Sequence, residues 1–311
     1  MSSGTKPLVL YKKPTRWNFR HNWLLYAMLL PGMACVIIFN YIPMYGIIIA
    51  FQDYQPSMGF IGSPFVGLDW FKSLFIMPDV KEILSNTILI ALSKIILGMI
   101  FPIIFSLLMN EVSNQVFKRS VQTISYLPYF LSWVILGGVF IDLLSSVGLI
   151  NRFLSLFEIE SIFFLGSNKW FRPVIVITHI WKEFGWGSIL YFAALSAIDV
   201  TYYEAAVIDG ANRWKRVLNI TLPGIAPTII LLATLSLGGI LSAGFEQIFV
   251  LYNPSVYKTG DIIDTFVYRM GILDRQYSLS TAVNLLKSMV SLVLISISYY
   301  LANKLANYRI F

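Results

Sequence analysis

Long apolar runs alternate with short polar segments along this chain. Six of the runs are long enough, at about 1.5 Å of helix per residue, to cross about 30 Å of hydrocarbon. A further apolar stretch, residues 147–157, is too short to cross and predicts an interfacial or re-entrant helix. The pattern therefore predicts an all-α membrane protein with transmembrane helices at residues 23–45, 83–109, 121–144, 173–198, 225–248 and 280–303.

Composition supports a membrane protein. The chain is 57% hydrophobic and 13% charged, with a mean hydropathy of +0.71. The charged fraction is about half that of soluble globular domains, which excludes an ordinary soluble domain. The single cysteine, Cys35, lies inside an apolar run, so an internal disulfide is impossible.

The distribution of charge indicates topology. The net charge is +7, which by itself could indicate an acidic ligand such as nucleic acid. However, the segments proposed as inner hold 12 Lys and Arg residues and the outer loops hold eight, and the strongest cluster precedes the first span. We predict that both termini face the cytoplasm, that residues 1–22 form a cytoplasmic tail, and that residues 23–311 form one transmembrane domain. We expect no nucleic-acid partner.

One polar segment, residues 201–223, lies between the fourth and fifth predicted spans. Thr201 and Glu204 have the spacing of a capping box at a helix start, and Gly210 is the residue type that ends a helix without strain. A second short helix is expected to begin near Asn212 and to end at Pro223. The segment is therefore predicted to be a compact helix-turn-helix that fits a groove on a partner.

The same segment resembles the EAA motif of permease subunits in binding-protein-dependent ABC importers, in the carbohydrate uptake group related to the maltose permeases. The resemblance implies a type I ABC importer permease fold, in which this segment is the coupling helix that contacts a cytoplasmic ATPase. It also implies that Glu204 anchors the helix, that Gly210 permits its turn and that Trp214 holds it against the membrane domain. The alternative is that Glu204 only caps a helix and Gly210 only turns it. The matching positions are Glu204, Ala205, Ala206, Asp209, Gly210, Ala211, Trp214, Ile220, Thr221, Leu222, Pro223 and Pro227.

Three further stretches resemble the subgroup of these permeases that serves complex oligosaccharides. The resemblance implies a bacterial cytoplasmic membrane location and four kinds of partner besides the lipid bilayer: a homologous second permease, a dimer of cytoplasmic ATP-binding subunits, an extracellular solute-binding protein and an oligosaccharide substrate. The stretches are Gly148-Leu149-Ile150-Asn151, Trp181 to Gly187, and Phe245-Glu246-Gln247 with Tyr252-Asn253-Pro254.

The chain lacks the sequence of an enzyme that uses ATP. It has no Gly-rich phosphate-binding loop ending in Lys-Ser or Lys-Thr, so ATP and Mg²⁺ are expected in partner subunits and no cofactor in this chain. Its two histidines, His21 and His179, are far apart, and neither a metal site nor a catalytic residue is predicted. His179 is interpreted simply as a polar residue of the fourth span.

A few charged and aromatic residues inside the predicted spans are candidates for a substrate path. Lys182 and Glu183 are about ten residues into the fourth span, near the bilayer midplane, where charges are expensive and usually face a cavity or partner. Indole rings stack on the C–H faces of sugars, so nearby tryptophans suit a saccharide. We expect Glu246 to pair with Lys287, or Lys287 to extend to the interface. The path residues predicted are Trp181, Lys182, Glu183, Trp186 and Glu246.

Alternatives remain at this point. Lys182 and Glu183 could form an ion pair that only fixes packing, and the tryptophans could be interfacial or packing residues. An ion-coupled secondary transporter of a small polar solute would use Lys182, Glu183 and Glu246 as ion-linked groups, although no inverted repeat is found in the sequence. A membrane scaffold without transport is a third, weaker hypothesis.

Overall fold

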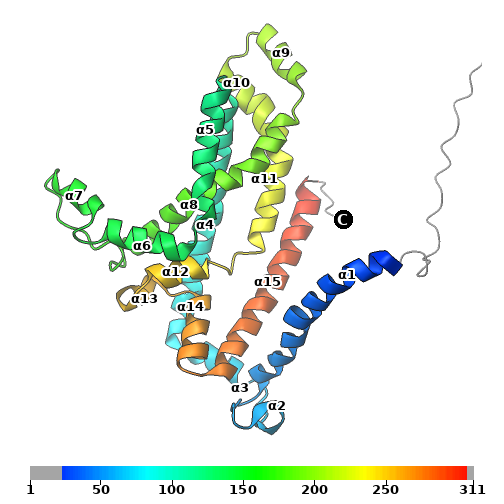
Figure 1. Ribbon diagram of the computed structural model, residues 1–311, viewed down its shortest axis with the longest axis vertical. Coiled ribbons are helices and arrows are strands. Elements are labelled where there is room, and N and C mark those ends of the chain that lie inside the picture. Colours follow the sequence, from blue (N-terminus) through cyan, green and yellow to red (C-terminus); the bar gives the residue numbers. More distant parts are fainter. Residues whose placement is uncertain (1–22, 307–311) are drawn as a thin grey trace, which may run out of the picture. The chain divides into compact units, whose positions relative to one another are not determined.

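The computed structural model describes residues 23–306 of the 311-residue chain, with side chains through residue 300, and consists of helices joined by loops in that range (Figure 1). It contains no β-strand there, and its one isolated antiparallel bridge joins Gln52 and Phe65. The predicted tail, residues 1–22, lies outside the described residues. The chain divides into two compact units, Met1–Ile48 and Ile49–Phe311.

The described part of the first unit is apolar helix. It comprises α1 (Trp23–Val36), a π-helical turn η1 (Ile37–Tyr41), and most of the 3-10 helix η2 (Ile42–Phe51), whose last residues belong to the second unit. The continuous run Trp23–Phe51 is long and apolar enough to cross a membrane, and nearly all of its large side chains are exposed within the chain. Such a surface suits lipid or another membrane helix.

Four long helices organise the second unit. The helix α4 packs along α8, and α11 packs against both α8 and α15. Many large apolar side chains of these helices are exposed, while their buried faces carry apolar residues and a few polar ones such as Lys94 and Lys182, so these helices are suited to a bilayer. Their bounds are α4 (Pro78–Asn110), α8 (Phe171–Ser196), α11 (Leu222–Leu237) and α15 (Tyr277–Ala306).

Short helices connect these long ones. They are α2 (Gly59–Gly62), α3 (Asp69–Ile76), α7 (Leu149–Ser155), α9 (Val200–Ile208), α10 (Arg213–Arg216), α12 (Phe245–Leu251), η5 (Pro254–Val256), α13 (Tyr257–Gly260), α14 (Ile263–Tyr268) and the π-helical turn η6 (Arg269–Leu273). The seven-residue α7 occupies the stretch predicted to be too short to cross.

The helices in the region of the third predicted span have other bounds than residues 121–144. Residues 121–144 are divided at Leu131 and Ser132, after a 3-10 turn that contains Pro128, and the next helix starts where the Ser132 hydroxyl accepts a hydrogen bond from the Ile135 amide at 3.3 Å. By length and composition the candidate span is instead Trp133–Ser155. The reason is that the first half of the predicted run is amphipathic rather than uniformly apolar. The elements here are α5 (Gln115–Tyr126), η3 (Leu127–Phe130) and α6 (Trp133–Leu144).

The fifth span also differs from its predicted range of 225–248. The apolar helix runs from Arg213 to Leu237 and ends at two consecutive glycines, Gly238 and Gly239. Within residues 23–306, five helices are suited to crossing a membrane, or six if α8 and α9, which meet at a 69° bend, count as one broken span.

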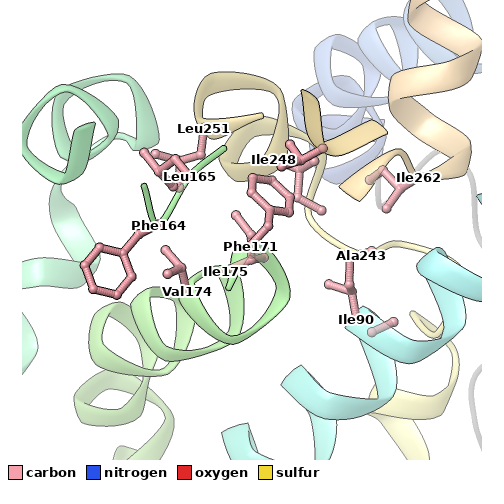
Figure 2. Close-up of a cluster of buried hydrophobic side chains, with 12 residues drawn as sticks. Ile90, Phe164, Leu165, Phe171, Val174, Ile175, Ala243, Ile248, Leu251 and Ile262 are labelled. Atoms are coloured by element: carbon pink, nitrogen blue, oxygen red, sulfur yellow. The ribbon is translucent and has the colours of Figure 1, made fainter. Parts of the chain in front are cut away.

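A buried apolar cluster joins α4, α8 and α12 (Figure 2). Phe171 and Ile175 of α8 lie close to Ile248 of α12, and Ala243 lies above Ile90 of α4. These side chains are at most 2% exposed. The cluster therefore holds the segment between α11 and α12 against α4 and α8.

Candidate functional site

The helix α9 begins at a carboxylate cap. The Asp199 Oδ1 atom accepts a hydrogen bond from the Thr201 amide at 2.9 Å, which lowers the pKa of Asp199. The predicted capping box of Thr201 and Glu204 is therefore wrong, because the helix starts before Thr201. Glu204 instead lies on the exposed surface of α9, where a partner can reach it.

The end of α9 has the glycine turn that the sequence predicts. Gly210 has a φ of 74°, in the left-handed region. The Ala211 amide donates to the Ala206 carbonyl at 2.8 Å, and the Gly210 amide donates to the Val207 carbonyl at 3.0 Å. This pair of bonds is a Schellman motif. No atom lies within 4 Å of a Cβ built on Gly210, so backbone conformation alone requires glycine here.

The second helix of the segment starts where predicted but does not stop at Pro223. The Asn212 Oδ1 atom accepts a hydrogen bond from the Lys215 amide at 2.9 Å and caps α10. The chain then continues through the π-helical turn η4 (Val217–Thr221) directly into α11. Pro223 falls in the first turn of α11, where the absent amide can be tolerated, and the wider π turn accommodates the ring.

The helix α9 is linked to the start of α11. The Tyr203 hydroxyl and the buried Thr221 hydroxyl are 3.0 Å apart. A Cβ on Gly224 would lie 2.7 Å from the Ile198 Cδ1 atom, so the chain on either side of α9 packs closely. A displacement of α9 therefore reaches α11 through direct contact.

Trp214 does not pack against the membrane helices of this chain. Its side chain is 74% exposed, so its predicted anchoring role within the chain is wrong. Short helices bury little, and Trp214 lies on a four-residue helix that has no buried residue. The segment instead leaves six large apolar or aromatic side chains exposed, namely those of Val200, Tyr202, Val207, Ile208, Trp214 and Leu218.

A cavity of about 320 Å³ lies between α4, α8 and the break that follows α11. Of the predicted path residues, Glu183 and Trp186 line it, and His179 and Lys94 join them. Ligand pockets typically start at about 300 Å³ and combine apolar walls with a few convergent polar groups. This cavity has that character, and His179 is therefore more than an isolated polar residue of the span.

Lys94 is at the centre of a buried hydrogen-bond network. Its Nζ atom donates to the Ala243 carbonyl and to the Gln247 Oε1 atom, each at 2.6 Å, and the residue is 6% exposed. The Gln247 Nε2 atom in turn donates to the Thr178 hydroxyl at 2.8 Å. Gly244 has a φ of 91°, and a Cβ there would lie 2.9 Å from the Lys94 Nζ atom. The network therefore holds the wall of the cavity in place.

Lys182 lies behind the cavity rather than in its lining. Its Nζ atom donates to the Tyr129 carbonyl at 2.9 Å and is 3.5 Å from the Glu183 carboxylate. It also lies 5.0 Å from the centre of the Tyr129 ring, close enough for a cation–π contact. The Trp186 ring stacks on the same tyrosine at 4.5 Å with 4° between the planes. Lys182 thus supports the residues that line the cavity.

Two predicted path residues are not part of this cavity. The Trp181 ring packs edge-on against Phe140, with 5.7 Å between ring centres, because it projects from a different side of α8. Glu246 is exposed at the start of α12. The predicted pair of Glu246 and Lys287 is wrong, since Lys287 forms its ion pair with Asp264.

Sequence reasoning missed the roles of Lys94 and Gln247. A lysine in the middle of an apolar span signals a functional or structural partner, but the partner lies 153 positions away and its identity has no local signature. Gln247 was visible only as part of the Phe245-Glu246-Gln247 stretch.

Comparison with known proteins gives consistent matches. The family model described as "Binding-protein-dependent transport system inner membrane component" matches residues 94–307. Protein LplB of Bacillus subtilis (strain 168) is 45% identical over 286 residues, which cover 92% of this chain and 90% of that protein. The polygalacturonan/rhamnogalacturonan transport system permease protein YteP of the same organism is 43% identical and covers 90% and 88%.

The fold has close counterparts among solved structures. One is a chain of a bacterial ABC transporter involved in the import of the acidic polysaccharide alginate, with a TM-score of 0.86, 38% identity, and coverage of 92% of this chain and 97% of that chain. Another is a bacterial alginate ABC transporter in complex with an alginate pentasaccharide-bound periplasmic protein, with the same TM-score and identity and coverage of 94% and 98%.

Proposed function

The chain belongs to the family of binding-protein-dependent transport system inner membrane components, and on that basis we propose that it conducts oligosaccharides or polysaccharide fragments into the cell. It is a multi-pass permease subunit with the type I ABC importer fold, and it is not itself an enzyme. In the proposed assembly it pairs with a homologous second permease in the bacterial cytoplasmic membrane. Two separate subunits bind ATP and Mg²⁺, and an extracellular solute-binding protein delivers the saccharide.

The observation that carries the substrate proposal is the cavity beside α8. It brings the Trp186 indole together with Glu183, His179 and Lys94. An indole packs against the apolar C–H face of a sugar ring, while carboxylate and imidazole groups bind its hydroxyls. The names of YteP and of the alginate importers refer to saccharides, which agrees with this chemistry.

The proposed mechanism connects the cavity to the coupling segment through α11. Closure of the ATP-binding subunits displaces α9, and the contact of Tyr203 with Thr221 passes that displacement to the start of α11. Near its other end, Ser236 of α11 lines the cavity. One helix therefore contacts the coupling segment at its start and the proposed saccharide site near its end.

Two tryptophans provide a matched test. Trp186 and Trp181 are 41% and 45% exposed on the same helix, but only Trp186 lines the cavity. In proteoliposomes holding the whole transporter, we expect Trp186→Ala to raise the KM for saccharide uptake about tenfold, which is about 1.4 kcal/mol. Trp181→Ala should change the KM less than about twofold. Equal effects of the two variants, or no uptake of any saccharide by the wild type, would overturn the proposal.

A further inference from the structure

A second cavity, of about 570 Å³, lies beyond the start of α12. It is bounded by α12, α14, η6 and the first turns of α15. The lining is mainly apolar, and aromatic rings, hydroxyls and one carboxylate contribute to it. The residues that matter here are Phe245, Asp264, Tyr268, Tyr277, Ser280 and Thr281.

The two cavities adjoin across one peptide bond of the main chain. Ala243 and Gly244 line the first cavity, and the next residue, Phe245, lines the second. The start of α12 therefore separates them. Gly244 is held by its left-handed conformation and by the nearby Lys94, so the position of this partition is set by the buried network.

The aromatic wall of the second cavity is braced by ring contacts. Phe245 and Tyr268 have ring centres 5.7 Å apart. Phe249 contacts both, stacking on Phe245 at 5.2 Å and meeting Tyr268 edge-on at 4.9 Å. Rings fixed in this way lose little conformational entropy when a ligand packs against them.

Polar groups lie beside these rings, since Asp264 is four residues before Tyr268 on α14, and Ser280 and Thr281 follow Tyr277 on α15. Asp264 is paired with Lys287, and their side chains are 22% and 15% exposed, so the pair is only partly shielded. Charges in a chain this apolar normally face a partner or a wet cavity. The Ser280 and Thr281 hydroxyls donate to the Tyr277 carbonyl at 3.0 and 2.7 Å, which leaves their oxygen lone pairs available to accept.

We infer that this second cavity is a saccharide subsite, which takes an outer ring of the same oligosaccharide whose leading ring enters the first cavity. The inference rests on the proposed function. Aromatic rings beside hydroxyl and carboxylate groups match the apolar C–H face and the hydroxyls of a pyranose, whereas a lipid chain would offer these polar groups no hydrogen bond. The shared partition at Gly244 and Phe245 places the two subsites in sequence along one path.

The length of the saccharide tests the inference. The complete transporter in proteoliposomes is assayed with galacturonate, alginate and arabinan oligosaccharides of two to five rings. We expect Tyr268→Ala to raise the KM about tenfold for the longest saccharides transported and less than twofold for disaccharides. Tyr268→Phe, which keeps the ring, should behave as wild type, and Thr281→Val should show the same dependence on length to a smaller degree.

The control is Phe157→Ala. That ring is 63% exposed and contacts Phe153 away from both cavities, and we expect no change at any length. A KM increase for Tyr268→Ala that is equal at every length, or the absence of any increase, overturns the subsite while leaving the proposed function intact. Failure of the wild type to take up any saccharide overturns the proposed function, and this inference with it.

Discussion

The coupling segment and the Lys94 network are built in opposite ways. Around α9, the hydrogen bonds of Asp199, Gly210 and Asn212 join residues no more than five positions apart. In the network, Lys94 reaches a carbonyl 149 positions away and Gln247 reaches a hydroxyl 69 positions away. The first region therefore has a shape dictated locally, while the second exists only once the helices have packed.

The two regions also differ in exposure. The coupling segment leaves Ile208 86% and Trp214 74% exposed, whereas Lys94, Gln247 and Thr178 are each at most 6% exposed. A locally formed, exposed element can move as a unit when a partner pulls on it. A buried network tolerates little change, because each polar group removed leaves another unsatisfied.

Loss of Lys94 should have the largest effect. Lys94→Met leaves the Ala243 carbonyl and the Gln247 Oε1 atom without their donor, which we expect to lower the free energy of unfolding by about 3 kcal/mol. The measurement is the thermal unfolding midpoint of the purified transporter in detergent. Lys72→Met is the control, because Lys72 is 74% exposed and its partner Asp69 is exposed too. Equal midpoints for the two variants would contradict the role of the network.

Substitution at the glycine turn should act on coupling more than on stability. Gly210→Val forces a β-branched residue to a φ of 74°, at a cost of about 1–3 kcal/mol, confined to the segment. We expect ATP-driven uptake to be lost while the transporter still assembles. Gly138→Val is the control, because Gly138 has open space around its Cβ position and no positive φ. Normal ATP-driven uptake by the Gly210→Val variant would contradict a role of this turn in coupling.

The link between α4 and α10 should matter less. Arg213 and Glu111 approach to 3.9 Å, but Arg213 is 77% exposed, so solvent screens the pair. We expect Arg213→Ala to change the free energy of unfolding by less than about 1 kcal/mol. The unfolding midpoint should be insensitive to salt for wild type and variant alike. A loss comparable with that of Lys94→Met would show that the coupling segment is not locally stabilised.

The smallest effect concerns the cap of α9. The pKa of Asp199 is lowered in the folded state, so its contribution is present above the ordinary value of 3.8 and is lost as the pH falls through the folded-state pKa. Hydrogen exchange of the α9 amides, corrected for the intrinsic rate, should therefore quicken at acid pH. In Asp199→Asn, whose side-chain oxygen still accepts, this acid dependence should disappear. Its persistence in the variant would assign the effect to another group.

The difference between the regions explains what the sequence could and could not predict. Gly210 and Asn212 act through residues close to them in the sequence, so the turn at Gly210 and the helix start at Asn212 could be predicted from the sequence. Pro223 misled because the π turn before it accommodates a ring that would end an ordinary helix. The packing of Trp214 was predicted wrongly for another reason. An aromatic residue on a short helix can be exposed to a partner as readily as it can be buried, and Trp214 is exposed.

The substrate path depended on information that the sequence does not carry. Both residues are tryptophans, so the sequence does not distinguish Trp181 from Trp186. Only their positions around α8 place Trp186 in the cavity and Trp181 against Phe140. The choice of Asp264 over Glu246 as the partner of Lys287 likewise follows from the packing of α14 on α15. Apolar periodicity identifies the spans, but the third and fifth boundaries depend on breaks at Leu131–Ser132 and at Gly238–Gly239, which composition does not locate.

The account depends most on α9 facing the cytoplasm and contacting an ATP-hydrolysing subunit. The most direct test is labelling of Glu204→Cys, in a Cys35→Ala background, with a membrane-impermeant maleimide. We predict labelling in inside-out vesicles stripped of the ATP-hydrolysing subunits, protection when those subunits are restored, and no labelling in intact cells. Labelling in intact cells, or equal labelling with and without the subunits, would contradict the account.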